Sequence, residues 1–70
     1  MKKIESPVSG VVMHYLVKPG DAVIEGQEVA MVESMKMEIP VVAEAAGTVA
    51  KLCSEAGATV AESDTLIELA

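Results

Sequence analysis

Short apolar runs alternate with turn-forming residues along the whole chain. The stretch 10–17 is rich in β-branched residues and ends at the turn Pro19-Gly20-Asp21. The stretch 47–54 has the same character and ends at a second turn, at residues 56–58. Proline fixes φ and glycine frees it in such turns, so the pattern predicts two long strands that each reverse direction sharply.

After each of these turns the same three elements follow in the same order. A short apolar piece comes first, a polar corner second and a further strand third. In the first half they lie at 22–24, 25–27 and 28–33, and in the second half at 59–61, 62–64 and 65–69. Several short strands with regularly spaced turn signals predict a small all-β sandwich or barrel.

The two halves of the sequence are copies of one unit. Sliding the sequence along itself by 37 positions places Gly10 on Gly47 without a gap. Four more identities fall in the same register: Val12 with Val49, Gly20 with Gly57, Val23 with Val60, and Glu25 with Glu62. We predict one domain over residues 1–70, with repeat units at roughly 4–33 and 41–70, a hairpin at 34–38 and a pseudo-twofold relation between the halves.

The junction between the units breaks a local rule. Residues 32–39 are built from strong helix formers, but a strand ends just before them and 39–43 opens the second unit. A tight hairpin with Met35 and Lys36 at its tip is consistent with both neighbours. Such hairpins favour Asn-Gly or other glycine-containing pairs, because φ is positive in the turn. Since Met-Lys departs from that preference, we predict a functional constraint at this turn.

Composition limits what so small a domain can do. The chain has 70 residues, 51% of them hydrophobic but only 1% aromatic, so its core is made of Val, Ala, Ile, Leu and Met. A core of this size leaves little room for a deep substrate pocket. Eleven acidic residues against five basic ones give a net charge of −6, which disfavours nucleic acid and anionic membrane surfaces as partners.

The cysteine count and the N-terminus indicate the compartment. Cys53 is the single cysteine, so an internal disulfide and a thiolate zinc cage are both excluded. Residues 1–7 reach a glutamate and a proline before any apolar run that a signal peptide would need. We therefore expect a soluble, cytoplasmic protein without a metal site or a membrane-inserted segment.

The hairpin tip carries the candidate chemistry. Lys36 is a flexible amine held away from the body of the domain, and on its own it could be a solvated surface lysine. Met35 and Met37 flank it, although large apolar side chains at an exposed tip do nothing for solubility. Soft, adaptable methionine is suited instead to contact with a partner surface.

Residues 33–38, Glu-Ser-Met-Lys-Met-Glu, resemble the biotin attachment motif of biotin carboxyl carrier domains, in which Met-Lys-Met surrounds the biotinylated lysine. Segments 6–10, 18–23, 26–27 and 45–49 resemble the same family, so the likeness covers nearly the whole chain. The related lipoyl domains share the fold and usually carry Asp-Lys-Ala at the tip. The neighbours of Lys36 therefore favour biotin over lipoate.

The resemblance implies a flattened β-barrel, or barrel-sandwich hybrid, of two four-stranded antiparallel sheets, with Lys36 on an exposed turn opposite the chain termini. It implies that a biotin protein ligase joins biotin to Lys36 as an amide and recognises the flanking Met35 and Met37. Glu33 is expected to belong to the same attachment site as Lys36. Biotin would carry a carboxyl group from a biotin carboxylase to a carboxyltransferase or decarboxylase site. The chain itself would be a carrier without catalytic residues.

Two other functions stay open at this stage. One is a lipoyl carrier in an acyl-transfer or glycine-cleavage type of system, and the other is an unmodified module of the same fold used for protein contacts. A unique acceptor lysine separates both carriers from the interaction module. The acceptor of the carboxyl group and the oligomeric state are left open.

The remaining polar residues have plainer interpretations. His14 has no partner for metal or nucleophile chemistry and is expected on a strand surface. Cys53 aligns with Leu16 in the repeat and is expected to be a small strand hydrophobe. Glu25 and Glu62 are corner residues matched by the repeat. Glu33 and Glu38 flank the tip, either as solvated charges or as residues that help the ligase to orient the hairpin.

Overall fold

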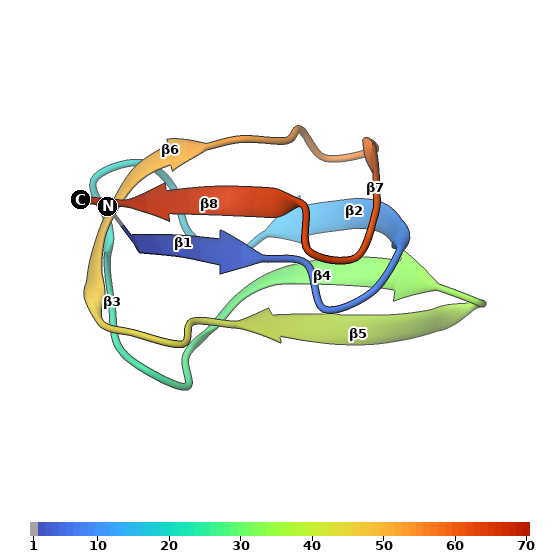
Figure 1. The fold of residues 1–70 in the computed structure, drawn as a ribbon, viewed down its shortest axis with the longest axis horizontal. Coiled ribbons are helices and arrows are strands. Elements are labelled where there is room, and N and C mark those ends of the chain that lie inside the picture. Colours follow the sequence, from blue (N-terminus) through green and yellow to red (C-terminus); the bar gives the residue numbers. More distant parts are fainter. Residues whose placement is uncertain (1) are drawn as a thin grey trace.

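Eight β-strands and no helix make up the described part of the chain, residues 2–70 of a computed structural model (Figure 1). Met1, the first residue of the predicted domain, lies outside the described residues. No helix capable of crossing a membrane is found in residues 2–70. In chain order the strands are β1 (Lys2–Glu5), β2 (Gly10–Tyr15), β3 (Ala22–Val23), β4 (Glu28–Ser34), β5 (Met37–Val42), β6 (Gly47–Leu52), β7 (Thr59–Val60) and β8 (Thr65–Leu69).

The strands form two four-stranded antiparallel sheets, which confirms the predicted all-β class. One sheet has the order β1-β8-β6-β3 and the other β5-β4-β2-β7. A shift of 37 residues carries β1 onto β5, β8 onto β4, β6 onto β2 and β3 onto β7, so the two orders are the same order of equivalent strands. Each sheet therefore contains strands from both halves of the sequence.

Backbone hydrogen bonds between the halves follow the same relation. The amide of Gly20, in the turn after β2, donates to the carbonyl of Val49 in β6 at 2.8 Å. The amide of Gly57, in the turn after β6, donates to the carbonyl of Val12 in β2 at 2.6 Å. Each half thus completes a turn of the other half, and neither can satisfy its own backbone alone.

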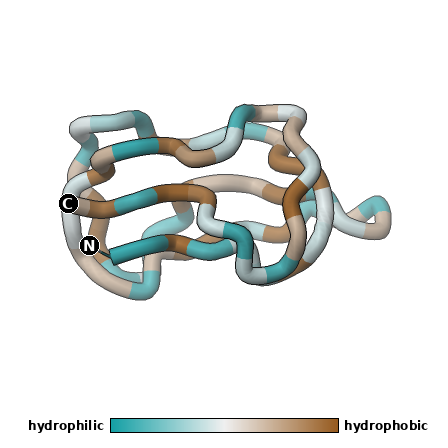
Figure 2. Tube along the Cα trace, turned by 45° about the horizontal axis from the view of Figure 1, so that its top comes forward, coloured by the Kyte–Doolittle hydropathy of each residue, from teal (hydrophilic) through white to brown (hydrophobic). Residues whose placement is uncertain are grey.

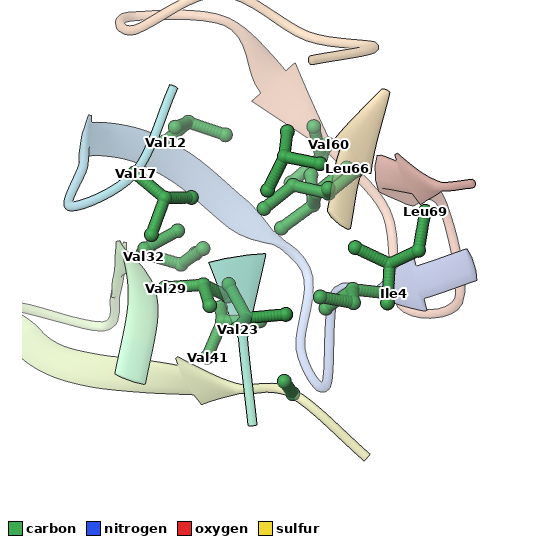
Figure 3. Packing of buried hydrophobic residues seen from close by; sticks show 14 residues of the cluster. Ile4, Val12, Val17, Val23, Val29, Val32, Val41, Val60, Leu66 and Leu69 are labelled. Carbon is green, nitrogen blue, oxygen red and sulfur yellow. The ribbon is translucent and has the colours of Figure 1, made fainter. Parts of the chain in front are cut away.

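The core is a layer of aliphatic side chains that point toward one another between the two sheets (Figure 3). Hydrophobic stretches of the chain around it are interrupted by hydrophilic residues (Figure 2). All but two of the buried hydrophobic residues, Val17 and Ala43, pair with one another at the 37-residue spacing. The pairs are Ile4 with Val41, Val12 with Val49, Val23 with Val60, Val29 with Leu66, Ala30 with Ile67, and Val32 with Leu69.

Two predicted strands end earlier than expected. The stretches predicted as 10–17 and 47–54 are strands only as far as Tyr15 and Leu52. In the first case the pairing of β2 with β4 ends at Tyr15 and Ala30, next to the position where the register of β4 with β5 shifts. The amide of Leu16 still donates to the carbonyl of Val29 at 2.9 Å, so one hydrogen bond continues past the last ladder pair, where the bulge in β4 disrupts the regular register. The hydrophobic pattern of β2 cannot reveal this irregularity.

Gly10 in β2 lies too close to the backbone of β4 to carry a side chain. A Cβ atom at residue 10 would overlap the carbonyl oxygen of Glu33, which belongs to the backbone and cannot rotate away. At Gly47, the equivalent position in β6, the nearest atom to such a Cβ is a side-chain carbon of Leu69 at 3.3 Å.

We expect Gly10→Ala to lower the free energy of unfolding by about 1–3 kcal/mol, because overpacking against backbone forces β4 to move. Gly47→Ala is the matched control and is expected to cost less, since the nearest atom there, Cβ of Leu69 at 3.3 Å, needs to shift by only a few tenths of an ångström. Urea denaturation monitored by circular dichroism measures both losses. An equal loss in the two variants would contradict the close approach of β2 and β4.

Candidate functional site

Lys36 lies at the tip of the hairpin formed by β4 and β5. Ser34 ends β4, Met37 begins β5, and these two residues form the last pair of the ladder. Met35 and Lys36 therefore make the whole turn, as predicted, and the helical propensity of the surrounding sequence is overridden. The hairpin extends at one end of the molecule, and the start of β1 and the end of β8 lie at the other end of the longest axis (Figure 1).

The backbone at the tip is held in a conformation that its residues disfavour. Met35 has a φ of 52° and Lys36 a φ of 64°. Positive φ at both central residues is what a two-residue type I′ hairpin requires, because its twist matches that of the flanking strands. For a residue with a Cβ atom this region costs about 1–2 kcal/mol. The ladder of β4 and β5 imposes the conformation on the turn.

Both methionines at the tip are exposed rather than packed. Met35 is 91% exposed and Met37 64% exposed, and Lys36 between them is exposed as well. Burial in the core therefore does not account for these two side chains. The tip presents an amine between two apolar side chains to any partner that approaches the end of the molecule.

Two carboxylates face each other just below the tip. Glu33 of β4 and Glu38 of β5 are paired directly across the ladder, and both are exposed. Like charges in directly opposite positions of a sheet are unfavourable for folding. The sequence predicts that these residues flank the tip, and the register adds that they form one acidic pair beside Lys36.

The site has the requirements for a covalent group on lysine. An amine that accepts an activated carboxyl group must be reachable from outside, and Lys36 is exposed at the end of the hairpin. No pocket is found in residues 2–70. Within the same residues, no group of three or more His, Cys, Asp and Glu side chains is placed to hold a metal ion.

The other polar residues considered from the sequence lie away from the tip. His14 is exposed on β2, and Glu25 and Glu62 are exposed at their corners. Cys53 is half-buried, and its thiol donates a weak hydrogen bond to Oε2 of Glu68 at 3.7 Å. Burial, with the negative charge of Glu68, raises the pKa of the Cys53 thiol, which keeps it in its unreactive protonated form.

The sequence alone assigns no role at the site to Gly10, although its position against Glu33 fixes β2 beside the base of the hairpin. The available signal is a glycine inside a predicted strand, which often marks a close backbone approach.

Fold and site together define a small β-barrel domain that displays one lysine on a strained hairpin far from its termini. The family described as "Biotin-requiring enzyme", which covers biotin and lipoyl attachment domains, matches residues 2–69. The chain belongs to this family.

Known proteins similar to this chain include a carboxylase chain, an attachment protein and a lipoyl domain. The human mitochondrial propionyl-CoA carboxylase alpha chain is 50% identical over 66 residues, which is 94% of this chain and 9% of that protein. The biotin/lipoyl attachment protein of Bacillus subtilis (strain 168) is 53% identical over 53 residues, 76% of this chain and 73% of that protein.

Among solved structures, the lipoyl domain of the 2-oxoglutarate dehydrogenase complex of Azotobacter vinelandii superposes with a TM-score of 0.79. It is 29% identical, and the match covers 100% of this chain and 96% of that domain. The chain thus has the extent of an isolated attachment domain but spans only about a tenth of the human carboxylase chain.

We expect Met35→Asn to raise the free energy of unfolding by about 0.5–1 kcal/mol, because asparagine tolerates positive φ better than methionine. Met37→Asn is the control, since Met37 already lies in β5. Thermal and urea unfolding measure both. A loss of stability in Met35→Asn, or an equal gain in both variants, would show that the turn backbone is not strained.

Proposed function

We propose that the chain is a biotin carboxyl carrier domain and that Lys36 is its covalent attachment residue. The observation that carries the proposal is the Met-Lys-Met tip. The hairpin holds Met35 and Lys36 in a disfavoured backbone conformation, and both methionines of the tip are exposed. Membership of the attachment family supports it, as does the human propionyl-CoA carboxylase relative. A folding role alone would be served better by Asn-Gly at the turn.

The attachment step needs a reachable amine and a partner that supplies an activated carboxyl group. We propose that a biotin protein ligase provides biotin as its adenylate. Nζ of Lys36 attacks the acyl carbon as the free base, the amide bond forms, AMP leaves and the proton of the amine is lost to solvent or to the ligase. The flanking Met35 and Met37 would pack against the ligase, since both are exposed on either side of the nucleophile.

When bound, biotin supplies a ring nitrogen that carries a carboxyl group. The contribution of the chain is to hold Lys36 at the end of a rigid body with extents of 31 × 19 × 18 Å. Tethering replaces diffusion by an effective concentration at each partner active site. The proposed partners are a biotin carboxylase and a carboxyltransferase or decarboxylase, and the chain would contribute no catalytic group of its own.

The proposed organisation is one domain over 1–70, with units at roughly 4–33 and 41–70 and the attachment hairpin at 34–38. The equivalence of strand order, core residues and inter-half hydrogen bonds supports it. The cytoplasm is the proposed compartment, supported by the single cysteine and the acidic composition.

A lipoyl carrier is the second candidate. The superposition with a lipoyl domain over the full chain favours it, because the fold alone does not distinguish the two cofactors. The tip residues oppose it, since the neighbours of Lys36 are methionines rather than the Asp and Ala usual in lipoyl domains.

Intact-mass measurement on protein co-expressed with a biotin protein ligase tests the assignment. We expect a single biotin adduct on the wild-type chain and none on Lys36→Arg, because the guanidinium is not an acyl acceptor. Lys18→Arg is the matched control and is expected to keep the adduct. An adduct formed only with lipoate would establish the lipoyl carrier, and no adduct with either cofactor would leave the interaction module.

The acidic pair gives a separate prediction. We expect the double variant Glu33→Gln and Glu38→Gln to raise the KM of the ligase for the carrier, while removal of the facing charges stabilises the fold by about 0.2–1 kcal/mol. The double variant Glu25→Gln and Glu62→Gln, at the two corners, is the control. Biotinylation kinetics that do not change in the hairpin variant would leave Glu33 and Glu38 as solvated charges.

A further inference from the structure

The pseudo-twofold relation provides an internal control for every exposed position. On the outer face of one sheet, Glu68 of β8 lies between Lys3 of β1 and Lys51 of β6, which makes a row of alternating charges. Rows of alternating charge of this kind are ordinary for a solvated sheet face.

The equivalent row of the other sheet has no charge at its centre. Met31 of β4 takes the place of Glu68 and lies between Pro40 of β5 and His14 of β2. Because the charged row folds equally well in the other half of the same molecule, folding does not require an apolar row here.

The contrast continues on either side of this row. Val11, Met13 and Val42 are 37%, 36% and 42% exposed. Their equivalents in the other half are the small or polar residues Thr48, Ala50 and Glu5. We define the apolar face as five residues of the β5-β4-β2 surface: Val11, Met13, Met31, Pro40 and Val42. In the ladders Glu33 lies beside Val11 and Glu28 beside Val42, so carboxylates border these apolar side chains. An apolar group of this kind on one side only is typical of a surface that meets another protein.

The acidic and basic side chains on the strands of this sheet are of one sign. Strands β2, β4, β5 and β7 carry Glu28, Glu33 and Glu38, all exposed, and no lysine or arginine. A second copy of the chain, pressed face to face, would bring two sets of these carboxylates together. A partner with an apolar centre and a rim of lysine or arginine would match both features.

We propose that the apolar face docks the domain on the biotin carboxylase that loads it. This rests on the proposed carrier function and names a surface for it. An enzyme that binds ATP and bicarbonate concentrates positive charge around its active-site entrance, which is the rim that the glutamates fit. Met31 and Pro40 lie in the two strands of the hairpin, roughly 15 Å from its tip at the rise of a β-strand. A partner held there fixes the direction in which Lys36 enters.

The test copies the charged row onto the apolar face. The double variant Met31→Glu and His14→Lys reproduces the arrangement of Glu68 and Lys51 and leaves the net charge unchanged with His neutral. The mirror variant, Glu68→Met and Lys51→His, is the matched control. Each chain is first biotinylated by the ligase, and its loading is measured by intact mass. It is then titrated as substrate of the biotin carboxylase with ATP and bicarbonate.

We expect the apolar-face variant to raise the KM of the biotin carboxylase for the carrier about tenfold, with kcat retained. Its biotinylation rate should stay within about twofold, because the ligase needs only the tip. The mirror variant should match the wild type. For the wild type, KM should rise with NaCl, because salt screens the acidic rim.

Several results would overturn the proposal. An unchanged KM removes the docking role, and an equal loss in biotinylation assigns the face to the ligase. A raised KM only in the carboxyltransferase reaction assigns it to that component. Sedimentation showing a wild-type dimer that the variant dissociates assigns it to a second copy. Absence of biotin on the wild-type chain overturns the carrier function itself, and the mass measurement reveals this before any KM is determined.

Discussion

The exchange of backbone hydrogen bonds between the two halves is the interaction on which the structure depends. Gly20 donates to Val49 and Gly57 donates to Val12, so each long strand receives the turn of the opposite half. A chain of 70 residues with one aromatic residue and no disulfide has little else with which to hold two sheets together. The bonds place the sheets so that paired aliphatic side chains close the core, and the fold forms only when both halves are present.

This arrangement separates folding from function along the chain. The residues of the core and of the exchanged hydrogen bonds all belong to the two units. The side chains of the junction between the units are therefore not needed to close the barrel. Met35 and Lys36 can therefore hold an unfavourable backbone without loss of the fold, because the β4-β5 ladder fixes both ends of the turn. Gly10 contributes by letting β2 approach the base of the hairpin. The result is a lysine at the tip of a paired β-hairpin rather than on an unpaired loop.

Much of this could be predicted from the sequence because the repeat compares the chain with itself. Glycines and valines in step revealed the succession of elements along both halves, and the departure from Asn-Gly drew attention to Met35 and Lys36. The ends of β1 could not be predicted, because Ile4 is its only buried residue and one residue gives no periodicity to detect. Glu33 and Glu38 face each other because of the register of the β4-β5 ladder. Positive φ at both turn residues fixes that register, and composition does not predict it.

Differences between the two units are informative only where they change what a partner meets. Ser63 has a φ of 74° at the position where Gly26 has 87°, yet both are exposed corner residues whose amides donate to the other half, to Ser6 and Ala43, at 2.8 Å. The two corners therefore have the same backbone structure and similar surface chemistry, although one has serine and the other glycine. Met31 in place of Glu68 also leaves the fold alike, but it converts a charged row into an apolar one. Symmetry in the backbone with asymmetry on the surface is expected when one side of a carrier must be recognised and the other must stay solvated.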